Sequence, residues 1–170
     1  MYSLRPIRHV AIMSAMLSVA GLTIAHAGSS NADKDFVMKA AEAGMAEVAE
    51  ARIALKNSQR PDVQMFARRM IADHTKANEQ LKTIAREQGI DMPNGPGDED
   101  IMRMKQLSAL AGKDFDNAYI QQEVKDHQAA VALFTQESDS GQNAQLKSFA
   151  TTTLPTLKEH DKMVNALPQH

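Results

Sequence analysis

Four stretches of this chain repeat apolar residues at alternating spacings of three and four, as one face of an α-helix does. Ala, Glu, Lys, Gln, Met and Leu dominate these stretches, and all six have high helix propensity. Val, Ile, Tyr and Phe are scattered through the sequence instead of alternating with polar residues, as they would in half-buried strands. The sequence therefore predicts an all-α fold.

Turn-forming residues divide the pattern into four long helices and one short one. Pro61 suits the first turn of a helix, and Gly89 suits a helix C-terminus. The short turns predict two antiparallel hairpins, joined by a long connection that contains the short helix. The expected long helices span about 33–57, 61–88, 114–139 and 143–166, and the short helix spans about 98–110.

Three positions bear on how these helices begin and bend. We expect Asp33 or Asp35 to cap the first helix, and Asp114 to cap the third long helix. Pro155 lies inside the last helix, where a lost hydrogen bond and a ring clash should produce a kink.

Residues 1–27 have the pattern of a secretory signal peptide. Arg5 and Arg8 precede an apolar run at 10–24, and Ala-His-Ala at 25–27 fits the small-x-small cleavage pattern. The apolar run is shorter than the ~20 residues that span a bilayer, and no later segment approaches that length. We expect cleavage after Ala27, one domain at 28–170 without a transmembrane segment, and a periplasmic or secreted location.

The composition limits the chemistry of the chain. It has no cysteine, which excludes disulfides, thiolate metal sites and cysteine nucleophiles. Lys and Arg number 19 against 21 Asp and Glu, and no basic block is present, so we expect no nucleic-acid partner. The sequence has no Gly-x-Ser-x-Gly elbow, phosphate loop or Rossmann fingerprint, which favours a binding or structural role over an enzyme.

Each long helix carries one metal-capable side chain among the apolar residues of its buried face. His74, His127 and His160 take this position on the second, third and fourth long helices. Glu47 takes it on the first helix, and Glu50 follows one turn later on the same side. The sequence therefore predicts one carboxylate and three imidazoles near the axis of a bundle.

Distances along the helices test whether these four side chains lie at one level. At about 1.5 Å per residue, Glu47 and His74 lie about 18 and 22 Å from the turn that joins their helices. His127 and His160 lie about 21 and 28 Å from theirs, so His160 is displaced by about one helical turn. A common site is geometrically feasible, with His160 as its outlier.

This donor set suits a divalent transition metal, because imidazole and carboxylate bind such ions in many proteins. We expect Zn, Fe, Cu or Mn as the metal. The expected ligands are Glu47, His74, His127 and His160, with Glu50 and Glu123 as supporting carboxylates. The alternative is a metal-free Glu–His network with a trapped water, because buried polar groups must be paired, neutral or ligated.

Four phrases of the sequence carry a family resemblance: Phe66–His74, Phe115–Tyr119, Asp126–His127 and Phe149–His160. They resemble the domain-of-unknown-function 4142 family, a group of exported bacterial proteins. The resemblance covers about 32–167 and implies a ferritin-like four-helix bundle, which makes the expected fold a ferritin-like antiparallel four-helix bundle.

The chain departs from the two-metal pattern of many ferritin-like proteins, which repeats Glu-x-x-His on two helices. Apolar residues stand three positions before each of the three histidines, so the pattern favours a mononuclear histidine-rich site. Asp73, Asp126 and Glu159 directly precede the histidines, and adjacent residues point about 100° apart around a helix. We expect these three acids at the rim or in solvent.

Two functions remain open from the sequence. The first is an exported ferritin-like bundle that binds a transition metal, for metal binding or stress protection. The second is a non-catalytic structural or interaction module of the cell envelope, with a metal-free core. A homo-oligomer or an envelope protein is a candidate partner in either case.

Overall fold

The structure is a computed structural model, which describes residues 29–169. The predicted signal peptide at 1–27 lies outside the described residues. All regular secondary structure in the described part is helical, which confirms the all-α class. The helices are α1 (Asn31–Asn57), α2 (Pro61–Gln88), α3 (Asp98–Ser108), α4 (Gly112–Ser140) and α5 (Ala144–Asn165). Within 29–169, no helix has the length and apolar character needed to cross a membrane.

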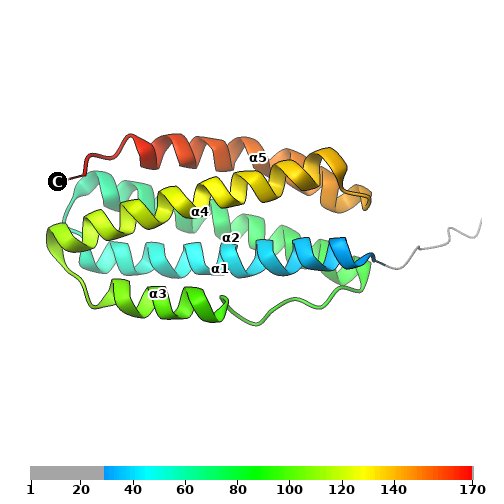
Figure 1. Ribbon diagram of the computed structural model, residues 1–170, viewed down its shortest axis with the longest axis horizontal. Coiled ribbons are helices and arrows are strands. Elements are labelled where there is room, and N and C mark those ends of the chain that lie inside the picture. Colours follow the sequence, from blue (N-terminus) through cyan, green and yellow to red (C-terminus); the bar gives the residue numbers. More distant parts are fainter. Residues whose placement is uncertain (1–28, 170) are drawn as a thin grey trace, which may run out of the picture.

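The long helices α1, α2, α4 and α5 run side by side along the molecule, and α3 lies outside them along α1 (Figure 1). Helix α1 packs against α2 and α4, and α5 packs against α4 and α2. Short turns at 58–60 and 141–143 join the two hairpins, while residues 89–97 lead from α2 to α3. Each long helix therefore presents one face to a shared interior.

The first residue of two helices differs from the sequence-based prediction. Ser30, rather than Asp33 or Asp35, caps α1, and Asp33 completes a reciprocal capping box with it. Helix α4 begins at Gly112 rather than near Asp114, because Gly112 adopts a positive φ of 58° that turns the chain into the helix earlier. Helix α5 runs through Pro155 without a break.

The α1 cap allows a direct test of local stability. The Ser30 hydroxyl accepts a hydrogen bond from the Asp33 amide at 3.1 Å. Ser30→Ala removes this acceptor and should lower the free energy of unfolding by about 1 kcal/mol. Ser30→Asp keeps an acceptor and should remain close to wild type in the same urea titration. Equal losses in the two variants would contradict a capping role.

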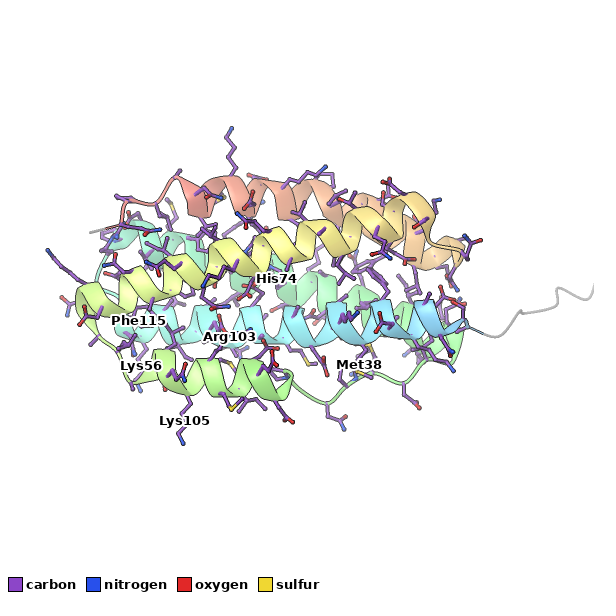
Figure 2. All side chains as sticks on the ribbon, viewed as in Figure 1. Met38, Lys56, His74, Arg103, Lys105 and Phe115 are labelled. Carbon is purple, nitrogen blue, oxygen red and sulfur yellow. The ribbon has the colours of Figure 1, made fainter. Side chains whose placement is uncertain are left out.

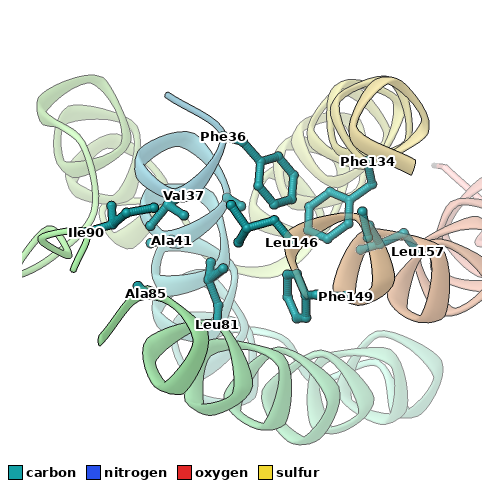
Figure 3. Packing of buried hydrophobic residues seen from close by; sticks show 12 residues of the cluster. Phe36, Val37, Ala41, Leu81, Ala85, Ile90, Phe134, Leu146, Phe149 and Leu157 are labelled. Carbon is teal, nitrogen blue, oxygen red and sulfur yellow. The ribbon is translucent and has the colours of Figure 1, made fainter. Parts of the chain in front are cut away.

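Two apolar clusters fill the interior. One surrounds Phe36, Phe134 and Phe149, whose ring centroids lie 5.3 to 6.5 Å apart (Figure 3). The other surrounds Phe66 and Tyr119 nearer the α1–α2 turn. On every long helix, a buried polar residue falls in the sequence between a member of one cluster and a member of the other. The interior therefore has a polar layer between two apolar ones.

Candidate metal centre

Three buried imidazoles meet in this polar layer. His74 from α2, His127 from α4 and His160 from α5 are 7%, 0% and 1% exposed. Their ring centroids lie 5.5 to 5.8 Å apart, and each ring offers a nitrogen within 4.8 Å of the others. Figure 2 shows His74 well away from both ends of the molecule. The structure thus brings the three predicted histidines together.

His160 reaches this group despite its expected displacement along the helix. Side chains on a helix lean toward its N-terminus. His160 on α5 therefore leans toward the α4–α5 turn, whereas His127 on the antiparallel α4 leans away from it. The two opposite leans narrow the gap that backbone distances alone predict.

Hydrogen bonds fix two of the rings so that each keeps one free nitrogen. His127 Nδ1 donates to the Glu123 backbone carbonyl at 2.8 Å, and His127 Nε2 has no hydrogen-bond partner. His160 Nε2 donates to the Asp73 carboxylate at 2.9 Å, and His160 Nδ1 has no partner. His74 Nε2 is also buried and unpartnered. Metal-binding histidines commonly have this arrangement, with one nitrogen anchored and the other free.

Asp73 lies at the rim, as predicted, but it also contacts one of the histidines. Its carboxylate lies at the edge of the interior, paired with Arg69, and it contacts His160 across the α2–α5 interface. Because Asp73 belongs to a different helix from His160, sequence spacing carried no signal of this contact. Of the other two acids predicted at the rim, Glu159 is 56% exposed and Asp126 is 27% exposed.

Glu47 belongs to a second group of donors beside the first. Glu47, Glu123 and His127 also offer ligand atoms within 4.8 Å of one another. The nearest Glu47 and Glu123 oxygens lie 3.9 and 3.5 Å from His127 Nδ1, the nitrogen opposite the unpartnered one. Within 29–169, the four predicted ligands therefore form two groups that share His127, and Glu47 is not in the close group of three histidines.

Two further polar side chains adjoin the carboxylates. Glu50 is 1% exposed, and neither of its carboxylate oxygens has a hydrogen-bond partner. The Tyr119 hydroxyl is likewise buried and unpartnered. Sequence reasoning placed Tyr119 in the apolar face only, although its spacing of four from Glu123 and eight from His127 puts all three on one side of α4.

Burial shifts the pKa values of both groups toward their neutral forms. It lowers the pKa of His74 to about 3 and that of His127 to about 4, and it also lowers the pKa of His160. It raises the pKa of Glu50 to about 7 and that of Glu123 to about 8. At neutral pH the imidazoles are therefore uncharged, which is the form that binds metals.

A small cavity borders the histidines. Its volume is about 40 Å³, enough for one or a few water molecules. Glu47, His74 and His160 contribute to its wall, together with mostly apolar side chains from all four long helices. A ligand from solvent, such as water, therefore has room beside the two imidazoles.

Comparison with known proteins places the chain in a family. Residues 20–167 match the model of the family described as "Domain of unknown function (DUF4142)". The chain belongs to the DUF4142 family. No curated protein matches the DUF4142 chain significantly. The match spans all five helices and so includes every residue of the two donor groups.

One solved structure resembles this DUF4142 protein in fold. It is the crystal structure of a DUF305 fragment from Deinococcus radiodurans, with a TM-score of 0.71. The alignment covers 81% of this chain and 95% of that chain, at 15% sequence identity. At this identity the likeness concerns the fold alone, so function has to be argued from the donor groups.

Proposed function

We propose that this DUF4142 protein is an exported, ferritin-like four-helix bundle that binds a divalent transition metal in its core. The proposed domain is residues 28–170, released to the periplasm or secreted after loss of the signal peptide. His74, His127 and His160 are its primary ligands. The observation that carries the proposal is that each imidazole keeps one buried, unpartnered nitrogen beside the other two.

The chemistry of these donors fits a transition metal. A buried polar nitrogen without a partner destabilises the folded state, so three of them in neighbouring rings indicate that a further group binds them. A tetrahedral ion with metal–nitrogen bonds of about 2.0–2.1 Å holds its nitrogens about 3.4 Å apart. The rings therefore need only a modest contraction from their 4.8 Å limit to bind one ion.

The identity of the donors favours some ions over others. Imidazole nitrogens suit Zn, Cu and Fe better than they suit Mn, which prefers oxygen. Glu47 lines the same small cavity as His74 and His160, and its Oε2 atom is unpartnered. We assign Glu47 as the carboxylate that balances the charge of the ion and, with a water, fills its remaining positions. Such a site serves metal binding or protection against metal stress.

Copper titration of untagged, metal-free protein tests the proposal. Wild-type protein should bind Cu(II) at a site with nitrogen hyperfine structure in its electron paramagnetic resonance spectrum. His127→Ala should weaken this site by at least ~100-fold, since it removes one of three nitrogen ligands.

Ile120→Ala is the matched control. Ile120 is fully buried on the same helix, so this variant creates a cavity without removing a donor atom. It should bind Cu(II) like wild type. An unchanged nitrogen-ligated signal in His127→Ala, or its absence from wild type, would reject the histidine site. The latter result would favour the envelope module with a metal-free core.

A further inference from the structure

Behind His127, three carboxyl groups lie buried together without partners. Glu47 and Glu50 come from α1 and Glu123 comes from α4, and they are 5%, 1% and 0% exposed. Both oxygens of Glu50, both oxygens of Glu123 and the Oε2 atom of Glu47 lack hydrogen bonds. Burial raises the pKa of both Glu47 and Glu123, and the negative charge of Glu50 raises both further.

No lysine or arginine within 29–169 forms an ion pair with these three acids, and the neighbouring His127 is uncharged at neutral pH. Arg103 on α3 is near enough to lower the pKa of Glu50 by its charge, although burial of Glu50 outweighs this effect. The Arg103 guanidinium makes its ion pairs with Asp100 and Asp126 instead. The acids therefore have no cation from the described chain to balance their ionised forms.

The Tyr119 hydroxyl is an independent sign of a ligand at this place. Tyr119 is 0% exposed, and its oxygen has no hydrogen-bond partner. Tyr119 lies one turn before Glu123 on the same side of α4, and burial together with the charges of Glu123 and Glu47 raises its pKa. A buried hydroxyl normally finds a partner, so an unpartnered one next to two unpartnered acids leaves hydrogen-bonding and ligating capacity that a further group can use.

We propose that Glu47 and Glu123 bind a second divalent cation through oxygen, with Glu50 and Tyr119 adjoining it and water completing its coordination. This inference extends the proposed function, because the second ion lies across His127 from the three-histidine site. Oxygen donors suit hard ions such as Mn(II), Fe(II) and Mg(II), and they bind Cu(II) less strongly than imidazoles do, so one equivalent of Cu(II) goes to the histidines first. The two groups therefore differ in the class of metal that they select.

His127 connects the two sites by geometry. Its Nε2 is unpartnered, its ring centroid lies 5.5 to 5.8 Å from those of His160 and His74, and its Nδ1 lies 3.5 Å from the Glu123 carboxylate and 3.9 Å from that of Glu47. A metal on Nε2 makes the Nδ1 proton more acidic and strengthens its attraction for nearby carboxylates. A metal ion in one site should therefore change the affinity of the other site through the His127 ring.

Binding of Mn(II) to metal-free protein, followed by electron paramagnetic resonance and equilibrium dialysis, tests the second site. Wild-type protein loaded with one Cu(II) should still bind one Mn(II) per chain. Glu123→Gln should weaken Mn(II) binding by at least ~10-fold and leave the nitrogen-ligated Cu(II) signal in place. Glutamine matches the neutral form of Glu123, whose pKa is about 8, so this variant should fold.

Two variants separate this inference from the proposed function. His160→Ala removes a ligand of the first site only, and should lose Cu(II) affinity while keeping Mn(II) binding. Glu137→Gln changes another buried acid of α4 outside the donor groups, and should alter neither ion. If circular dichroism shows that Glu123→Gln does not fold, Glu47→Gln replaces it. Because Glu47 also adjoins the first site, this variant should weaken Mn(II) binding by at least ~10-fold and change at most the affinity for Cu(II), while the nitrogen hyperfine structure from the three imidazoles remains.

Three results are decisive. No Mn(II) binding by the Cu(II)-loaded wild type, or equal Mn(II) affinity in wild type and Glu123→Gln, overturns the second site and leaves the first intact. Mn(II) binding without any nitrogen-ligated Cu(II) overturns the proposed function and supports the second site. Loss of Mn(II) binding in Glu137→Gln to the same extent as in Glu123→Gln overturns the assignment of ligands.

Discussion

Removal of bound metal should lower the melting temperature of the wild-type protein by roughly 8–16 °C. A ligand that binds only the folded state adds about 4 kcal/mol when its free concentration is a thousand times its dissociation constant. In a chain of this size, 1 kcal/mol corresponds to about 2–4 °C. Differential scanning calorimetry with and without Zn(II), the metal-free state being prepared with a chelator, measures the difference.

The His160→Ala variant provides the comparison for this shift. It lacks one of the three imidazoles, so most of the Zn(II)-dependent stabilisation should disappear. Ile120→Ala should melt at a lower temperature than wild type but keep the full shift, because its cavity contains no lost donor. If neither Zn(II) nor the chelator changes the wild-type melting temperature, the result would instead support the metal-free Glu–His network.

Metal-free protein should be most stable near pH 5–6 and should lose about 2 kcal/mol as the pH rises to 8. The folded state holds Glu50 with a pKa of about 7 and Glu123 with a pKa of about 8, both raised from 4.5. A raised carboxyl pKa means that the folded state binds more protons than the unfolded state. Its stabilising effect is complete below the unfolded pKa and is lost as the pH passes through the folded values.

The histidines produce the opposite trend on the acidic side. The pKa of His74 falls to about 3 and that of His127 to about 4, both from 6.5 in the unfolded chain. The unfolded state therefore takes up more protons below pH 6.5, and stability falls as the pH decreases toward these values. Between about pH 4.5 and 6.5 the two trends largely cancel, so the stability has a broad maximum near pH 5–6 and falls on both sides of it.

Urea titrations between pH 5 and 9 in the presence of a chelator measure this profile. The double variant Glu50→Gln and Glu123→Gln should flatten the alkaline side, because it removes the two titrating groups. Glu159→Gln changes an acid whose side chain is 56% exposed and should leave the profile unchanged. Constant stability of the wild type from pH 6 to pH 8 would show that these carboxyls are not buried as described.

Periodicity was sufficient to predict the helices and the burial of the central donors. Spacings of three and four identify which residues share a helix face, and apolar neighbours identify the face that is buried. Glu47, His74, His127 and His160 are accordingly all buried in the structure. Gly89, predicted as a helix C-terminus, adopts the left-handed conformation there with a φ of 65°.

Periodicity could not predict which of the buried donors lie next to one another. Whether Glu47 lies nearer to the imidazoles or to Glu123 depends on how each helix is rotated and how far it is shifted against its neighbours. The contact between Asp73 and His160 depends on the same two variables. The Ser30 cap depends on local hydrogen bonding of a serine before the helix, where several residues had suitable side chains.

The polar layer lies between two apolar clusters, so the residues that pack the helices together are different from those that carry the donor atoms. Phe36, Phe134 and Phe149 at one end, and Phe66 and Tyr119 toward the other, hold the helices in register. Substitutions in the polar layer can therefore change which donor atoms are present while the flanking aromatic packing keeps the helices in place. In a fold divided in this way, the chemistry of the middle layer can vary independently of the packing that stabilises the two ends.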